Sequence, residues 1–172
     1  MATRNHPGPN AAAGDPELAA VARQIIDANR YLVLGTADQD GVPWVSPVWY
    51  AHAGYREFLW VSDPQARHSR SIEARPQVSI VIFDSSVPPD AAPAVYLSGA
   101  AHVVTGSRLE KSIEIYSRRS QEQGLPEWAP ADVRAPARPR LYRAVAAEQF
   151  VLKPGGDARI PVNAESLAGN RR

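Results

Sequence analysis

The chain has 172 residues, enough for one domain with a sizeable hydrophobic core. Its formal net charge is only +1, which excludes binding of nucleic acid or acidic membranes through overall charge, so any anion site must be a local cluster. The chain has no cysteine, which excludes disulfides, cysteine-based metal sites and thiol catalysis.

The N-terminal residues predict neither a membrane span nor a signal peptide. Residues 1–14 are rich in Ala, Pro, Gly and Asn and predict a disordered arm without a signal peptide's apolar segment. No apolar run in the chain approaches the roughly 18 residues that a membrane span needs. We therefore expect a cytoplasmic protein that spans no membrane and binds no nucleic acid.

The first predicted element is an amphipathic helix. Asp15 is expected to be its N-cap, because Pro16 follows in a position that suits the first turn of a helix. Apolar residues then recur at helical spacing from Leu18 to Ile26 and predict one buried face. The helix should end at Asn29 or Arg30.

Beyond this helix the pattern is mainly that of strands. Six strands are predicted, over residues 31–37, 42–52, 57–62, 77–84, 94–105 and 140–152. The first three should form a meander, with Gly41 supplying a positive φ in the first turn. Gly99 should mark a β-bulge. Helices are expected after Asp63 and over 107–124, so a small β-barrel fits better than a parallel α/β sheet.

The second predicted strand has two unusual properties. Pro43 and Pro47 each lack the N–H that a central strand needs, so this should be an edge or bulged strand. It is also apolar on both faces, with Val45 and Trp49 on one and Trp44, Val48 and Tyr50 on the other. An edge strand of this kind usually lies against a second subunit or a bound ring.

The segment after the third strand is a candidate anion site. Asp63 and Pro64 predict a helix N-cap and first position, and a helix N-terminus favours a phosphate. Four following residues can carry positive charge: Arg67, His68, Arg70 and Arg75. Arg67 can bind two phosphate oxygens, and His68 or Ser69 can add donors. The alternative is an exposed helix whose arginines face water.

Three stretches together resemble a known family. "LVLGTADQDGVPWVSPVWYAH", "EFLWVSDPQARHSRSIEARPQVSIVIFD" and "YLSGAAHVV" are similar, in order and spacing, to the FMN-binding split-barrel family typified by pyridoxamine 5′-phosphate oxidase. The resemblance covers roughly residues 31–105, and the later helix and last strand fit smaller relatives of that enzyme. It implies a split β-barrel of about six antiparallel strands over 15–152. The residues over 153–172 are polar and predict a loose C-terminal tail.

The resemblance also implies a homodimer with flavin sites at the subunit interface. Val61 and Ser62 match the strand end that contacts the flavin phosphate, and Arg67 and His68 match the family's Arg-Lys pair that binds it. The second strand matches the segment that lines the flavin ring. The residues expected to bind the cofactor are Ser46, Pro47, Val48, Trp49, Val61, Ser62, Arg67, His68 and Ser69.

Two departures argue against the parent enzyme's own reaction. Ser46 stands where the oxidase has a phosphate-binding Arg, and Ala51 where it has a substrate-binding Lys. The oxidase's C-terminal segment with Trp and Arg also has no counterpart here. We expect an oxidoreductase that uses FMN to act on another small molecule, without a residue that can be named as catalytic.

Other assignments remain open at this stage. The same groove could hold the deazaflavin F420, or the protein could be a non-catalytic flavin- or haem-binding module. The four histidines lack metal-ligand spacing, although His52 or His102 could serve a haem. Trp44, Trp49 and Trp60 are expected in the core and interface, and Arg118 and Arg119 on a solvated helix face.

Overall fold

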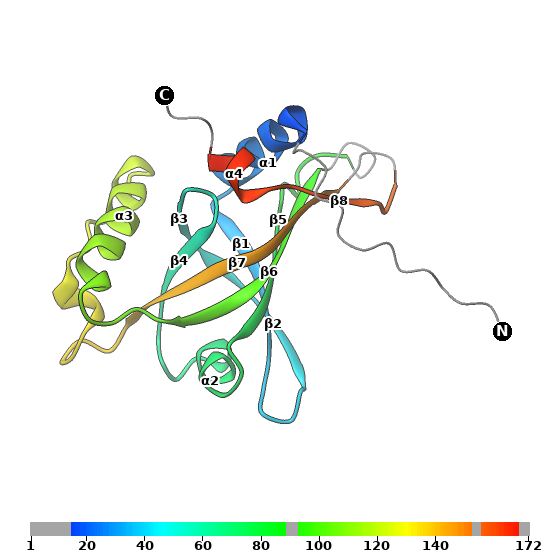
Figure 1. The fold of residues 1–172 in the computed structure, drawn as a ribbon. Coiled ribbons are helices and arrows are strands. Elements are labelled where there is room, and N and C mark those ends of the chain that lie inside the picture. Colours follow the sequence, from blue (N-terminus) through cyan, green and yellow to red (C-terminus); the bar gives the residue numbers. More distant parts are fainter. Residues whose placement is uncertain (1–14, 89–92, 153–155, 169–172) are drawn as a thin grey trace.

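The computed structural model describes residues 15–88, 93–152 and 156–168, so the arm predicted at 1–14 lies outside the described residues. These residues form a mainly β structure, as predicted, in which one antiparallel sheet curls into a half-barrel (Figure 1). The strands are β1 (Tyr31–Ala37), β2 (Pro43–Trp49), β3 (Ala51–Ala53), β4 (Glu57–Ser62), β5 (Gln77–Phe83), β6 (Ala94–Val103), β7 (Arg140–Leu152) and β8 (Arg159–Pro161). Their order is β2-β1-β5-β6-β7-β4-β3, with β8 paired to β7.

Helices cover the ends and one side of the curled sheet. In the described residues they are α1 (Pro16–Ala28), α2 (Arg67–Ala74), α3 (Arg108–Glu122), α4 (Ala164–Ala168) and a short 3-10 helix, η2 (Pro130–Val133). Helices α1 and α4 lie together at one end of the sheet, α2 lies at the other end, and α3 packs beside β3 and β4 (Figure 1). Asp15 caps α1 through its side chain and Pro16 begins it, as predicted.

The predicted three-stranded meander is wrong. The second predicted strand breaks at Tyr50, and β2 pairs with β1 whereas β3 pairs with β4, whose other neighbour is β7. The break occurs because the Tyr50 side chain is completely buried and its hydroxyl donates to the carbonyl oxygen of Ile26 at 2.6 Å. The chain therefore passes at Tyr50 from one edge of the sheet to the other. The prediction that the proline-bearing strand is an edge strand is confirmed.

Two apolar cores hold this arrangement together. The larger one fills the concave side of the sheet, where alternate residues of the strands point inward between α1 at one end and Ile72 of α2 at the other. The smaller one lies between α3 and the opposite face of β4 and β7, and includes Leu59, Ile113 and Leu141. Because both faces of β4 are covered, its central residues are all buried.

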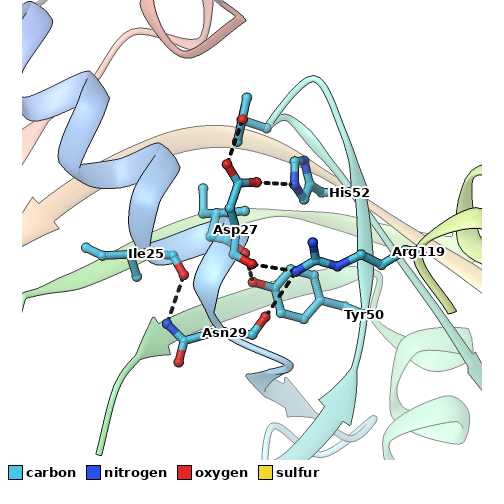
Figure 2. Close-up of polar contacts among 8 residues, drawn as sticks. Ile25, Asp27, Asn29, Tyr50, His52 and Arg119 are labelled. Carbon is cyan, nitrogen blue, oxygen red and sulfur yellow. Dashed lines mark hydrogen bonds and ion pairs between the residues drawn. The ribbon is translucent and has the colours of Figure 1, made fainter. Parts of the chain in front are cut away.

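The C-terminal end of α1 is capped by side chains. The Asn29 side chain donates to the carbonyl oxygen of Ile25 at 2.8 Å, and the Arg119 guanidinium of α3 donates to that of Asp27 at 2.7 Å (Figure 2). The last turn of α1 has no basic residue of its own, so Arg119 supplies the positive charge that this end of a helix favours. Arg118 and Arg119 were both expected on a solvated face of α3. This is confirmed for Arg118, which is exposed, and is wrong for Arg119, which is half-buried.

The expectation of a loose segment after residue 152 is wrong for residues 156–168. Strand β8 extends the sheet beside β7, and α4 packs against α1. Val162 and Leu167 are buried in the larger core, with Leu167 fully inaccessible to solvent. Two such residues are too few to produce a recognisable period in the sequence. Among the described residues, no helix is long and apolar enough to cross a membrane.

The bulge predicted at Gly99 is confirmed. The register between β6 and β7 shifts between Ser98 and Gly99. A Cβ atom at Gly99 would overlap the carbonyl oxygen of Val145 in β7. This oxygen belongs to the backbone of a paired strand, so it cannot move aside as the end of a flexible side chain would.

We therefore expect Gly99→Ala to lower the free energy of unfolding by about 1–3 kcal/mol, the usual cost of forcing atoms into a packed site. Gly156→Ala is the matched control, because a Cβ at Gly156 meets no atom within 4 Å. Urea denaturation of both variants measures the difference. Equal stability of the two variants would contradict this account of the bulge.

Candidate functional site

Helix α2 begins at Arg67, three residues later than predicted. Asp63 does not cap the helix; its carbonyl oxygen accepts from Ala66 N–H at 3.0 Å, and its carboxylate accepts from Gln65 N–H at 2.8 Å, forming a turn before the helix. The N-cap is Ala66, whose side chain makes no capping bond. The N–H groups of the first turn of α2 therefore have no side-chain acceptor, which suits an anionic ligand.

The negative charge of Asp63 is compensated within the protein. Its carboxylate forms an ion pair with Arg138 at 2.6 Å. A carboxylate so close to a helix N-terminus would otherwise repel an anion there. The pairing with Arg138 and the bond to Gln65 direct this charge toward the preceding turn.

His68 connects three elements of the fold. Its Nε2 lies 2.7 Å from the Ser62 hydroxyl at the end of β4, and its Nδ1 lies 3.2 Å from the Ser46 hydroxyl in β2. The Trp44 indole N–H donates to the same Ser46 oxygen at 3.1 Å. The half-buried imidazole thus ties the start of α2 to β2 and to the end of β4.

These contacts permit one continuous chain of hydrogen bonds. Trp44 donates to Ser46, the Ser46 hydroxyl donates to Nδ1 of His68, and Nε2–H of His68 donates to Ser62. In this order the hydrogen of the Ser62 hydroxyl is left for another acceptor. Burial lowers the pKa of His68 below its ordinary value of 6.5, which favours the neutral imidazole that such a chain requires.

Arg67 lies beside this chain on the exposed side. Its guanidinium lies 4.2 Å from the centroid of the Trp44 ring, in a cation–π contact that holds the side chain over the edge strand. Arg67, Arg70 and Ser71 line one cavity of about 310 Å³ that also borders the β1–β2 turn. These three side chains therefore lie on one side of the helix.

The other residues predicted to bind a cofactor do not all face this group. Val48 points into the larger core, and Ser69 is buried on another face of α2, where it lines a cavity of about 590 Å³. Trp49 donates to Gln123 at 2.9 Å and packs beside α3, whereas Pro47 is exposed. Val61 is half-buried against the smaller core.

Of the nine predicted residues, the structure therefore brings four side chains together, Ser46, Ser62, Arg67 and His68. Trp44 completes the group although it was expected only in the core or interface. Trp44 stands two residues before Ser46 on the same strand, so both side chains lie on one face of it. This spacing is the signal in the sequence from which Trp44 could have been predicted.

The other two histidines in the described part of the chain, His52 and His102, do not form a metal site. Nε2 of His52 lies 2.9 Å from the Asp27 carboxylate, which also accepts from the Tyr55 hydroxyl at 3.0 Å (Figure 2). His102 is exposed. Within the described parts of the chain, no group of three or more His, Cys, Asp or Glu side chains could hold a metal ion.

We expect His68 to titrate below pH 6.5 in the free protein, because its partly buried ring is desolvated. The unfolded chain then binds more protons than the folded one as the pH falls. The contribution of His68 to the free energy of unfolding is therefore complete above pH 6.5 and is lost as the pH falls toward the folded-state pKa. An NMR titration of the imidazole, assigned with His68→Gln, measures this pKa, and a value at or above 6.5 would contradict the buried arrangement.

Comparisons with known proteins agree with the fold described above. The family model described as pyridoxamine 5′-phosphate oxidase matches residues 18–150, more than half of the chain. No curated protein sequence matches. The fold is similar to that of a haem-binding protein from Mycobacterium smegmatis, with a TM-score of 0.69 and 20% identity over 90% of this chain. This chain spans 61% of that protein's length.

Two further solved structures share the fold. The haem storage protein HutZ from Vibrio cholerae has a TM-score of 0.63 and 20% identity over 78% of this chain and 94% of its own. An F420 reductase has a TM-score of 0.55 and 17% identity over 74% of this chain and 94% of its own. At these identities the likeness concerns the fold alone. The curled sheet, the order of the strands and the matching family model show that this chain belongs to the pyridoxamine 5′-phosphate oxidase family, as a smaller relative of the enzyme with a split β-barrel.

Proposed function

We propose that this protein binds FMN, with the flavin phosphate at the start of α2, and acts as an oxidoreductase on a small molecule. One observation carries the proposal: the end of β4, the edge strand β2 and the start of α2 contribute converging polar side chains next to an uncapped helix N-terminus. This combination of donors fits a phosphate monoester, which carries up to two negative charges and has three terminal oxygens.

Each residue of the proposed phosphate site has a distinct role. Arg67 is exposed and takes part in none of the ion pairs among the described residues, so its guanidinium is available for two phosphate oxygens. Ser62 donates its hydroxyl hydrogen, and the first N–H groups of α2 add backbone donors. His68 has both ring nitrogens engaged by serines, so we assign it as a positioning residue that orients Ser62.

The flavin ring is proposed to lie along the edge strand β2. The outward side of this strand presents Val45 and Pro47, both exposed, and the half-buried Trp49. These side chains exclude water from one side of a bound ring. The ring itself supplies the hydride chemistry when bound, and the protein supplies its position and surroundings.

The same surface is proposed to face a second copy of the chain. Pro47, Val33, Val81 and Tyr96 are register neighbours across β2, β1, β5 and β6, and they form an apolar row on the outer side of the sheet. Val45, with 64% of its surface exposed, extends this apolar area along β2. Contiguous apolar area of this kind favours association, and the family resemblance implies a homodimer with the cofactor at the interface.

Two other cofactors could occupy the same groove. F420 carries a ring and a phosphate comparable to those of FMN, and an F420 reductase shares the fold. Two proteins described as binding or storing haem share the fold as well, which supports a non-catalytic haem module as a different class of function. An absorption band in the Soret region of the loaded protein would identify haem as the cofactor. Parallel titrations with FMN and with F420 show which of these two cofactors the protein prefers.

We expect wild-type protein to bind FMN and Arg67→Ala to bind it about 10- to 150-fold more weakly, because the variant loses charge-assisted hydrogen bonds worth roughly 1.5–3 kcal/mol. The control is Arg118→Ala, which removes an exposed arginine of α3 outside the proposed site. Flavin fluorescence quenching measures all three affinities. Equal losses in the two variants would remove Arg67 from the site, and no affinity for FMN or F420 would refute the flavin proposal.

We expect Val45→Glu to weaken the homodimer strongly, because it places a charge in the apolar interface. The side chain is largely exposed in the single chain, so the fold of each subunit should be unaffected. Analytical ultracentrifugation measures the association, and circular dichroism checks the fold. A wild-type protein that remains monomeric at micromolar concentration would contradict the dimer proposal.

A further inference from the structure

A cavity of about 510 Å³ lies where the second half of β7 meets the end of β8 and the start of α4. Helix α4 lies beside α1, at the opposite end of the sheet from α2 (Figure 1). The cavity therefore shares no residue with the flavin-phosphate site proposed at α2. Its volume is in the range of small-molecule sites.

The β-bulge in β7 turns a polar side chain toward the inner side of the sheet. Ala146 belongs to the larger core, and strict alternation along the strand would place residue 148 on the same side. The register with β6 skips Ala147, so this extra residue shifts the alternation by one. Glu148 is therefore exposed, whereas Gln149 has only 4% of its surface exposed.

The buried amide of Gln149 lacks a partner for its oxygen. Within the described residues, the buried Oε1 of Gln149 accepts no hydrogen bond. The backbone of the same residue is paired, since its carbonyl oxygen accepts from the Val162 N–H at 2.9 Å. A buried acceptor without a partner lowers stability, and an apolar side chain of similar size would not. A donor bound in the cavity, which Gln149 lines, would supply the missing bond.

Two carboxylates give the cavity a negative character. Glu148 and Glu165 line it, and neither takes part in an ion pair within the described parts of the chain. Glu148 accepts from the Ser98 hydroxyl at 2.8 Å through one of its oxygens. The single cation among the lining residues, Arg56, is exposed and also interacts electrostatically with the neighbouring Glu57. Negative charge and acceptors therefore predominate, which favours a ligand that is positive and donates hydrogen bonds.

We propose that this cavity binds an organic ammonium ion, that is, a small amine with an apolar body. An ammonium group has three N–H donors, which suit Oε1 of Gln149 and the carboxylate of Glu165. Phe150 and Val162 supply apolar surface for the body of the ligand. A metal ion does not fit, because no group of three or more His, Cys, Asp or Glu side chains in the described ranges could hold one.

Phenethylamine, which is protonated at neutral pH, is the probe, and phenethyl alcohol is its uncharged counterpart of similar size. Each is titrated into full-length ¹⁵N-labelled protein and followed by NMR at the backbone amides of residues 147–149 and 163–166. We expect saturable shifts there with the amine. Affinity for the alcohol should be at least about tenfold lower, because a charged donor forms the stronger hydrogen bonds.

Variants test the two named contacts. Gln149→Met should bind the amine at least about tenfold more weakly, because it lacks the acceptor for the charged donor. Glu165→Gln should also bind more weakly, whereas Glu114→Gln, which removes an exposed carboxylate of α3 outside the cavity, should bind as the wild type does. In urea denaturation without ligand, Gln149→Met should be at least as stable as the wild type, because it removes an unpartnered buried acceptor.

Four outcomes would overturn the proposal. The first is the absence of saturable shifts at these amides, and the second is equal affinity for the amine and the alcohol. The third is a Gln149→Met variant that binds the amine no more weakly than Glu114→Gln does. The fourth is a marked loss of stability in Gln149→Met, which would show that the amide is already satisfied in the folded protein. Affinity for FMN should be the same in all these variants, so this test is separate from that of the flavin site.

Discussion

The burial of Tyr50 is the constraint on which the rest of the structure depends. Its side chain is fully enclosed in the larger core, and its hydroxyl is bonded to the backbone of α1. Before Tyr50 the chain forms the edge strand β2, which pairs with β1. After Tyr50 it forms the opposite edge strand β3, which pairs with β4. Because the two edges of the sheet are joined by this one residue, the sheet must curl rather than lie open.

The curl explains why the polar group at the start of α2 exists. Ser46 lies on β2 and Ser62 ends β4, two strands at or beside opposite edges of the sheet, and only a curled sheet brings both within reach of His68. The neutral, half-buried imidazole then fixes the distance between the two serines. Arg67 stays on the exposed side, held over Trp44, where a phosphate can reach it from solvent.

Local signals in the sequence predicted most of the elements. Asp15 and Pro16 correctly marked the start of α1, and Gly99 correctly marked the bulge that the approach of Val145 requires. The break at Tyr50 could not be predicted, because the residues around it have strand character throughout and only burial in the core distinguishes Tyr50. The structured segment around Leu167 was missed for a similar reason, since single buried residues leave no periodic pattern.

The candidate site was predicted in part. Arg67 and His68 could be named from their charge and their place after a strand, but the partners of His68 depend on distances across the curled sheet. Asp63 was wrongly assigned as the N-cap, because a turn that precedes a helix uses the same residues as a cap. Ser69 was expected beside His68, yet neighbouring residues on a helix point about 100° apart, and its side chain is buried on another face.

The central claim is that the start of α2 with Ser62 and Arg67 binds the phosphate of a flavin. It is tested most directly by titrating the protein with FMN and with riboflavin, which has the same ring but no phosphate, in wild type and in Arg67→Ala. The account predicts that wild type prefers FMN by at least about tenfold and that Arg67→Ala loses most of this preference. Equal affinities of the wild-type protein for FMN and riboflavin would contradict it.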